Sequence, residues 1–290
     1  INWSTAYDGG GNFEQTTAET TSGISGLIFR DLEIAFRAGT DAVYRRTGAS
    51  ASSGSPTFIE FNDCTFSGIP GFLLDQTGSN TLGGMSLIVY ACEGSIAALY
   101  NVQGVNDTLS PDQVILFDCN GLSMTDFHAG RDTCPQELYV TNCRLTISST
   151  IVINRTTDHF RWMNCEISTN ANPLFSSAAS AASIKSLIFK NITLRATGTA
   201  ATFGSFGDQD ERVFLQNITG YAADTIAQPL TNVFITVEAA SAAPQMENVH
   251  APQWTTVYSG PTPAPGISTA DHQHTIPGDD GDPETGREPR

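Results

Sequence analysis

The ten residues LYVTNCRLTI, numbers 138–147, decide the fold, because stretches of the same pattern recur along the chain. Each is a short apolar run with alternating character, and in most of them an Asn or Asp then precedes a Cys or Ile. The recurrences are IEFNDCTF (59–66), LIVYACEG (87–94), VILFDCNG (114–121), FRWMNCEI (160–167), LIFKNITL (187–194) and VFLQNITG (213–220). One strand pattern is therefore repeated through the chain.

The repeat has a regular period. Aligning the stretches on the residue after the Asn or Asp gives anchor positions 22 to 32 residues apart: Leu32, Cys64, Cys92, Cys119, Cys143, Cys165, Ile192, Ile218 and Val249. Alternation with period two predicts strands with one inward face. Repetition at this interval predicts a solenoid, in which each coil buries its apolar face against its neighbours. A sandwich or barrel would show turn signals at roughly 8 to 12 residues without aligned identical side chains. We expect an all-β protein, a right-handed parallel β-helix of about nine coils.

The polar residue before each anchor is expected at a corner where the strand turns. This column reads Asp31, Asp63, Ala91, Asp118, Asn142, Asn164, Asn191, Asn217 and Asn248. Asn and Asp tolerate left-handed backbone, and their side chains can bond equivalents on neighbouring coils.

The anchor should point inward, so the five anchor cysteines are expected to stack as small hydrophobic residues. Vertical disulfides and a zinc site are the alternatives; a zinc site is disfavoured because no Cys-x-x-Cys pair is present. Cys134 lies outside this column and is expected to be a free thiol in a loop.

Composition limits the partners and the domain plan. The formal charge is −16, from 30 acidic and 14 basic residues, which argues against nucleic acid and anionic membranes as partners. No apolar run approaches the roughly 18 residues of a membrane span, so no membrane insertion is expected. We expect an irregular N-terminal coil or cap at 1–26, the solenoid at 27–250, and an irregular Pro- and Gly-rich tail at 251–290. The first residues show neither an initiator Met nor a signal region, so a processed, truncated or fragmentary chain is expected.

The ladder of Asn and apolar side chains resembles the right-handed parallel β-helix (pectin-lyase-like) proteins. That class includes pectate lyases, polygalacturonases, and the tailspikes and tail fibres of viruses. The resemblance spans about residues 20–250. It implies a receptor-binding tailspike or tail-fibre protein of a virion, extracellular, which recognises a host-surface polysaccharide or glycoprotein and contacts other tail proteins. A β-helix polysaccharide lyase or glycoside hydrolase is one alternative, and a purely structural decoration or baseplate protein is the other.

Two loop clusters are weak candidates for catalysis, because glycan cleavage uses paired carboxylates. One, in TDFHAGRD, offers Asp126 and Asp132 beside His128; the other, in GDQDER, offers Asp208, Asp210 and Glu211. Both sequences are also typical of solvated turns.

Large apolar residues recur at outward positions of the strands. Ile88, Ile115, Tyr139, Ile188 and Phe214 lie four residues before their anchors. A strand that is apolar on both faces is covered on both faces. The cover is either a loop or tail of the same chain, or copies of the chain. Because virus spikes of this fold are usually trimers, the resemblance implies a homotrimer.

The tail contains His272 and His274 in an H-x-H arrangement. On an extended strand both imidazoles share a face, and three chains around a threefold axis would supply six nitrogens. Such a set suits iron or another first-row transition metal, and it is similar to the His-x-His iron sites of phage tail fibres. Solvent-exposed histidines are the alternative.

Overall fold

The structure is a computed structural model that describes residues 11–15, 26–39, 41–46, 58–76, 85–102, 111–130, 134–153, 158–177, 186–207, 212–238 and 244–262. Within these residues every regular element is a β-strand, and neighbouring strands pair in parallel. The chain forms two compact units. Unit 1 comprises residues 1–139 and 143–146, and unit 2 comprises residues 140–142 and 147–290. Each is described by itself.

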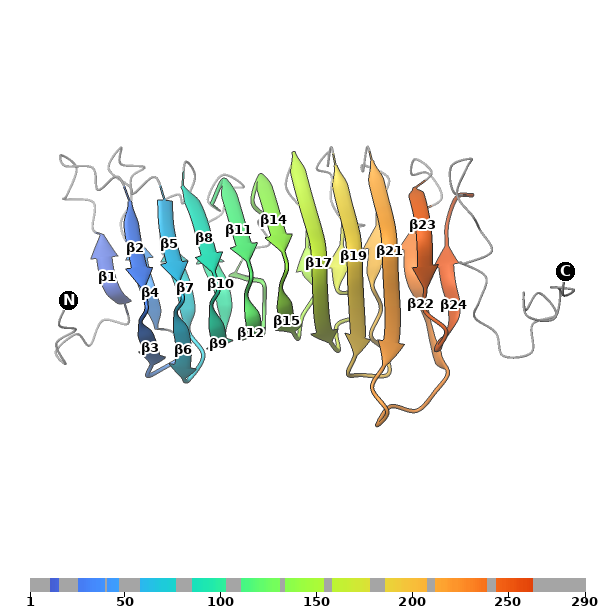
Figure 1. The fold of residues 1–290 in the computed structure, drawn as a ribbon, viewed down its shortest axis with the longest axis horizontal. Helices are drawn as coiled ribbons and strands as arrows, with labels where there is room; N and C mark the ends of the chain where they lie inside the picture. Colours follow the sequence, from blue (N-terminus) through green and yellow to red (C-terminus); the bar gives the residue numbers. More distant parts are fainter. Residues whose placement is uncertain are drawn as a thin grey trace, which may run out of the picture. The chain divides into compact units, whose positions relative to one another are not determined.

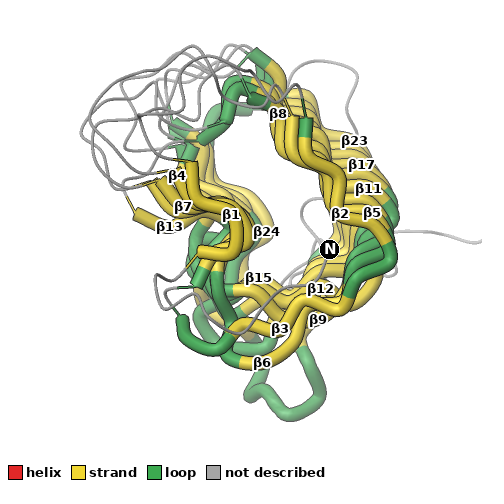
Figure 2. The backbone as a smooth tube through the Cα atoms, turned by 90° about the vertical axis from the view of Figure 1, so that its left-hand side faces the viewer, coloured by secondary structure: helices red, strands yellow, loops and turns green. Residues whose placement is uncertain are grey.

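Unit 1 is built from three ladders of parallel strands that surround its interior; the first two belong to one sheet, and the third is a sheet of its own (Figures 1 and 2). The strands that lead into the corners are β2 (Leu27–Arg30), β5 (Phe58–Asn62), β8 (Ser86–Tyr90) and β11 (Gln113–Phe117). Those that leave the corners are β3 (Glu33–Phe36), β6 (Thr65–Gly68), β9 (Glu93–Ile96) and β12 (Asn120–Met124). The third sheet contains β1 (Gly11–Gln15), β4 (Ala42–Arg46), β7 (Phe72–Gln76), β10 (Ala98–Val102) and β13 (His128–Gly130). Strands β14 (Glu137–Thr141) and β15 (Arg144–Ile147) divide between the two units.

Unit 2 repeats the plan with longer strands. β17 (His159–Thr169), β19 (Leu187–Ala196) and β21 (Val213–Ala222) each run through the corner without interruption, and β23 (Gln245–His250) pairs with β21. The second sheet contains β16 (Ile151–Val152), β18 (Phe175–Ser176), β20 (Gly204–Phe206), β22 (Leu230–Val237) and β24 (Trp254–Ser259). The long strands are visible as the longest arrows of Figure 1.

The parallel β-solenoid expected from the sequence is confirmed. The nine repeat units reappear as nine corners. Fewer than nine coils contain three separate strands, because the strands on either side of the corner merge in β17, β19 and β21. The expected right-handed winding is the hand that parallel strand connections adopt in nearly all proteins. Two strands lie outside the expected solenoid bounds of 27–250: β1 pairs with β4, and β24 pairs with β22.

Every expected corner residue has the left-handed backbone. The φ angles are between 50° and 55° at Asp31, Asp63, Ala91, Asp118, Asn142, Asn164, Asn191, Asn217 and Asn248. These are the positive-φ residues other than glycine in the described part of the chain. Eight of them are Asn or Asp, the residues that adopt this conformation at least cost, and Ala91 is the exception.

In unit 2 the corner side chains form a hydrogen-bonded row. Each Nδ2 donates to the Oδ1 of the preceding corner: Asn164 to Asn142 at 3.0 Å, Asn191 to Asn164 at 2.8 Å, Asn217 to Asn191 at 2.8 Å, and Asn248 to Asn217 at 2.9 Å. A carboxamide has both a donor and an acceptor, so it can continue such a row indefinitely. The corners of unit 1 are Asp or Ala, which at neutral pH cannot donate. The register of unit 2 is therefore fixed by a polar row as well as by its core.

The anchor cysteines pack inward as expected. All five are buried free thiols, and so is Cys134, which is buried where the sequence suggested a loop thiol. The thiols also donate to backbone: Cys92 Sγ lies 3.2 Å from the carbonyl of Tyr90, and Cys165 Sγ lies 3.2 Å from that of Met163. Cys64 and Cys119 make similar contacts two residues back. Cysteine thus fills the core and adds a second donor to a carbonyl that already accepts a backbone N–H from the neighbouring coil.

Aromatic residues dominate the two cores. In unit 1, Phe29 and Phe61 stack with ring centroids 5.0 Å apart, on neighbouring strands. In unit 2, Phe175 contacts the rings of Phe160, Trp162, Phe189 and Phe203 at 4.7 to 6.0 Å. Aromatic pairs of this kind contribute about 0.5–1.5 kcal/mol beyond the burial of their surface. Stacking of equivalent positions on successive coils converts the repeat into a continuous core.

We expect Asn217→Ala to lower the free energy of unfolding by roughly 2–4 kcal/mol. The change removes two hydrogen bonds of the row, worth about 0.5–1.5 kcal/mol each. It also puts alanine in left-handed backbone, where its side chain cannot form the local hydrogen bonds that offset the strain for Asn. Asn217→Gly removes the same bonds without the backbone penalty and should cost less. Denaturant unfolding measures both, and equal losses would contradict the backbone contribution. The reverse substitution, Ala91→Asn, should stabilise unit 1 by about 1 kcal/mol.

Stability should fall at alkaline pH because of the cysteine column. A hydrogen bond with the Cys143 thiol, together with burial, raises the pKa of Cys119 in the folded protein. The folded chain keeps this proton after the unfolded chain releases it above about pH 8.5, so the contribution is complete below that pH and is lost as the pH rises. Unfolding free energies measured between about pH 8 and 10 should decline less steeply for Cys119→Ala. An unchanged slope in this variant would contradict the assignment.

Candidate functional site

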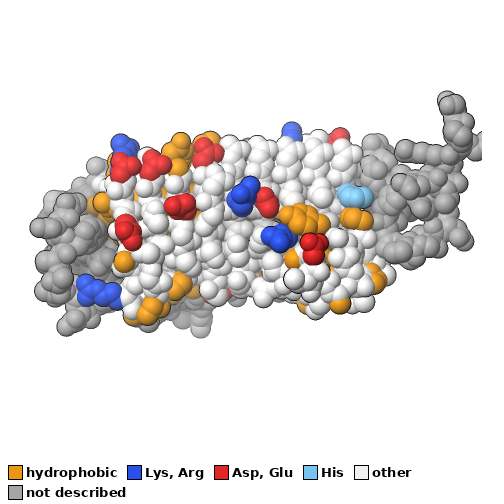
Figure 3. Space-filling view, turned by 60° about the horizontal axis from the view of Figure 1, so that its bottom comes forward, with side chains coloured by type: hydrophobic (Ala, Val, Ile, Leu, Met, Phe, Trp, Pro, Cys, Tyr) orange, Lys and Arg blue, Asp and Glu red, His pale blue; other side chains and the backbone are white. Residues whose placement is uncertain are grey.

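The surface beyond the corner in unit 2 gathers polar side chains that share one outward face. We call it the post-corner face and define it by Asn164, Glu166, Asn191, Thr193, Arg195, Asn217, Thr219, Tyr221, Asn248 and His250. Parallel register places Glu166, Thr193, Thr219 and His250 in one column, with Arg195 beside Tyr221 in the next. Their inward neighbours, such as Ile192 and Ile218, are fully buried, so alternation along the strands directs the polar side chains outward. Figure 3 shows one face of the molecule, on which hydrophobic, cationic, acidic and histidine side chains are set among uncharged polar ones in the right-hand half.

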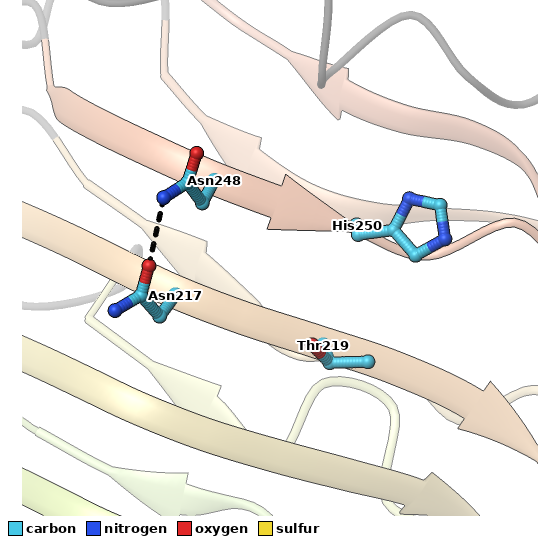
Figure 4. Close-up of a pocket in the computed structure, with 4 residues that line it drawn as sticks. All are labelled: Asn217, Thr219, Asn248 and His250. Atoms are coloured by element: carbon cyan, nitrogen blue, oxygen red, sulfur yellow. Dashed lines mark hydrogen bonds between the residues drawn. The ribbon is translucent and has the colours of Figure 1, made fainter.

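A shallow groove lies at the end of this face. It has a volume of about 330 Å³ and is lined by Asn217, Thr219, Asn248 and His250 from β21 and β23 (Figure 4). The two Asn side chains are joined by the last bond of the row, and Thr219 and His250 lie beside each other farther along the strands. All four side chains are hydrogen-bonding groups, and three of the four, all but the imidazole, are uncharged at any ordinary pH. The lining is suited to a ligand rich in hydroxyl groups.

Tyr221 and Glu166 extend the polar face away from the groove. The Tyr221 hydroxyl lies 3.5 Å from Glu166 Oε1, across the intervening strand β19. Arg195 is exposed and pairs in register with Tyr221. The ring of Tyr221 supplies an apolar body with a polar tip among hydroxyl and carboxamide groups. Such a mixture of one ring with several fixed polar groups is typical of small-molecule and sugar sites.

Unit 1 exposes a different surface. Its large exposed apolar side chains are Ile28, Ile69, Tyr90 and Phe117. Tyr90 and Phe117 occupy neighbouring strands, with ring centroids 5.6 Å apart and planes at 9°. The two rings therefore face each other and turn their edges to solvent. This arrangement forms an apolar ridge and offers little ring face for a ligand to stack on.

The expected contact residues of a trimer are only half exposed. Ile88, Ile115 and Tyr139 in unit 1, and Ile188 and Phe214 in unit 2, are all half-buried. Residues in register on successive strands cover one another along the sheet, which removes part of each side chain from water. On this side of unit 1 the exposed large apolar side chains are Ile28, which stands in the same column as Ile88, and Tyr90 and Phe117, two residues nearer the corner.

The catalytic and metal candidates divide between described and undescribed residues. Asp126 is half-buried, and its backbone N–H donates to Ala97 O at 2.9 Å. His128 is buried and stacks on Tyr100, with ring centroids 5.8 Å apart. Asp132, Asp208, Asp210, Glu211, His272 and His274 lie outside the described residues. No group of three or more side chains able to hold a metal occurs in the described part of the chain.

A buried ionic network in unit 1 is structural. Arg45 Nε lies 2.7 Å from Asp75 Oδ2, and Asn101 Nδ2 donates to Asp75 Oδ1 at 2.9 Å. The three residues stand in register on β4, β7 and β10 and are nearly inaccessible to water. Each carboxylate oxygen has a partner, as a buried charge requires. The network ties three coils of the third sheet together and leaves no atom of the carboxylate for a ligand.

The post-corner face was not anticipated from the sequence, although its signal is present there. The residue after each anchor reads Glu166, Thr193, Thr219 and His250 in unit 2, and Glu33, Thr65, Glu93, Asn120 and Arg144 in unit 1. In unit 2 these residues form one continuous surface because the long strands continue through the corner.

Comparison with known proteins gives no functional assignment for this chain. The chain matches no family model, and neither the curated proteins nor the solved structures gave a significant match. Among the described residues, no helix has the length and apolar character needed to cross a membrane.

Proposed function

We propose that the protein is a receptor-binding tailspike or tail-fibre protein of a virion, which recognises a glycan on the host surface. The groove on the post-corner face carries the proposal, because its lining consists of carboxamide, hydroxyl and imidazole groups held on rigid strands. Sugars present rows of hydroxyls that both donate and accept, and these side chains match that chemistry. The resemblance of the repeat to viral β-helix proteins supports the placement on a virion, outside the cell and beside other tail proteins.

Recognition is favoured over cleavage by the composition of the face. Glycoside hydrolysis generally requires two carboxyl groups on either side of the scissile bond. On the post-corner face as defined, Glu166 is the one carboxylate, and the groove itself is lined by none. The composition of the post-corner face therefore supports binding of a glycan without cleavage. A lyase or hydrolase of the same fold is the competing function, and the product assay below separates the two.

Removing the groove hydroxyl should weaken glycan binding. On an array of purified microbial capsule and envelope polysaccharides, we expect Thr219→Val to reduce affinity for the bound glycan about five- to tenfold. One lost hydrogen bond of about 1–1.4 kcal/mol corresponds to this factor. The matched control is Thr65→Val, which removes an exposed Thr from the equivalent position in unit 1.

Three outcomes decide the proposal. Equal binding by both Thr variants would move the site away from the groove, and no binding to any polysaccharide by the wild-type protein would refute glycan recognition. Release of reducing or unsaturated ends during incubation would identify an enzyme instead.

The homotrimer is part of the same proposal, with its contact centred on unit 1. A threefold arrangement brings equivalent outward faces close to one axis. In unit 1 this face carries Ile88, Ile115, Tyr139 and the exposed ridge of Tyr90 and Phe117. In unit 2 the equivalent face carries the expected contacts Ile188 and Phe214, but also Arg161 and Lys190, whose like charges would repel at an axis. We expect light scattering to give three times the chain mass, and Phe117→Asp to give the monomer. A monomeric wild-type protein would exclude the trimer.

A metal at His272 and His274 is a separable proposal. Imidazole nitrogens suit iron and its first-row neighbours, and three chains would supply six of them. We expect the purified trimer to contain one metal ion per three chains by elemental analysis. The double variant His272→Ala with His274→Ala should lose the metal and become unstable to dilution. A metal-free wild-type trimer, or an unchanged metal content in the variant, would exclude the site.

A further inference from the structure

The groove on the post-corner face runs along the strands. The four side chains that line it form two pairs, which follow one another along β21 and β23: the Asn pair at the corner, then Thr219 beside His250 (Figure 4). The next outward residue of β21 is Tyr221, because the residues on either side of it are buried. Successive outward residues of a strand are about 6.6 Å apart, so the line from Asn217 to Tyr221 spans about 13 Å.

Tyr221 is held across the neighbouring strand. Its hydroxyl lies 3.5 Å from Oε1 of Glu166, which belongs to β17, and β19 lies between the two strands. The Tyr221 side chain therefore leans over β19 and away from β23. Thr193, the residue of β19 in the same column as Glu166 and Thr219, is half-buried, whereas Thr219 and His250 on the other side are exposed. The phenol thus borders the groove on its β19 side.

Pro252 lies level with Tyr221 on the other side of the groove's far end. The register of Thr219 with His250, continued by two residues, puts Pro252 opposite Tyr221. The chain stays next to β21 there, because the last backbone N–H of β21 donates to Gln253 Oε1 at 2.6 Å. Pro252 is exposed and Tyr221 is half-buried. The groove therefore leads from four hydrogen-bonding side chains to two side chains that carry rings.

We propose that Tyr221 and Pro252 form an apolar subsite at the end of the groove, which receives the C–H face of one pyranose ring of the bound glycan. The inference rests on the proposed function, since it adds a specificity-determining part to the same site. Sugar rings carry C–H groups on their faces and hydroxyls at their edges. One sugar therefore binds Thr219 and the Asn pair through its hydroxyls, and a later sugar packs on the phenol. Glu166 is a positioning residue, because it holds the phenol in place.

The leaning phenol also sets the direction of the glycan chain. A chain that crossed the stack toward β17 would collide with the Tyr221 side chain over β19, so the glycan follows β21 and β23 outward from the corner. The span of about 13 Å holds about three sugar rings in a row. An apolar side chain of another protein is the competing occupant of the subsite. A sugar is favoured because it uses the ring side chains and the polar groups that lead up to them.

The test compares single variants of the full chain. Tyr221→Ala removes the ring, Tyr221→Phe keeps the ring without its bond to Glu166, and Glu166→Gln keeps an acceptor for the hydroxyl. The matched control is Tyr258→Ala, which removes another half-buried tyrosine of unit 2 whose hydroxyl is bonded within the chain, to Pro261 O at 2.5 Å. The probes are fragments of increasing length, from one sugar upward, cut by partial acid hydrolysis from a polysaccharide that the wild-type protein binds on the array. Titration calorimetry gives affinity, and light scattering gives assembly mass.

We expect the affinity of the wild-type protein to rise with fragment length up to about three sugars and then to level. Tyr221→Ala should lose about five- to tenfold with the longer fragments and little with single sugars. Tyr221→Phe should lose less, and Glu166→Gln and the control should bind as the wild type does. Unchanged affinity in Tyr221→Ala, or an equal loss at every length, would overturn the inference. A change of assembly mass confined to Tyr221→Ala would assign the subsite to a protein contact and also overturn it.

The outcomes also separate this inference from the proposed function. If Thr219→Val weakens glycan binding while Tyr221→Ala binds every fragment as the wild type does, glycan recognition stands and the apolar subsite is wrong. If the wild-type protein binds no polysaccharide on the array, the proposed function fails and the subsite fails with it.

Discussion

The left-handed corner is the constraint on which the rest of the structure depends. At each corner the backbone adopts φ near 50–55°, which turns the strand while keeping its successor in register with the coil below. Only Gly, Asn and Asp do this cheaply. The corner therefore restricts the backbone conformation of the residues on either side of it. This determines which side chains along the coil point inward and which point outward. Core, surface and groove follow from that assignment.

The chemistry of the corner differs between the units, and so do its consequences. The carboxamides of unit 2 form hydrogen bonds from coil to coil, and the long strands β17, β19 and β21 continue through the corner without interruption. Carboxylates at Asp31, Asp63 and Asp118 can only accept. They satisfy the backbone requirement of the corner but cannot continue a row of hydrogen bonds from coil to coil. Unit 1 therefore depends more on its aromatic stacks and on the buried Arg45–Asp75 pair.

The fold was predictable from the sequence because its determinants are local and repeated. Alternation around Cys143 sets the inward face, and the Asn or Asp before each anchor states where the backbone must turn. The columns of Asn and Cys followed from alignment alone, and the structure confirms both. The groove could not be predicted in the same way. It needs Asn217, Thr219, Asn248 and His250 to lie on one face of two merged strands, and the continuity of a strand through a left-handed residue has no signature in the sequence. The burial of Cys134 was missed for a similar reason, since it depends on packing outside the repeat.

The Asn row has a direction. In each of the four hydrogen bonds Nδ2 donates toward the lower-numbered coil, so the dipoles of the five carboxamides align along the stack. Hydrogen bonds in such a chain polarise one another, which concentrates partial negative charge on the oxygen at the end of the row. That oxygen is Oδ1 of Asn248, and Asn248 lines the groove. The interaction that holds unit 2 in register thereby also makes Oδ1 of Asn248, one of the residues that line the groove, a stronger acceptor than the oxygen of an isolated carboxamide.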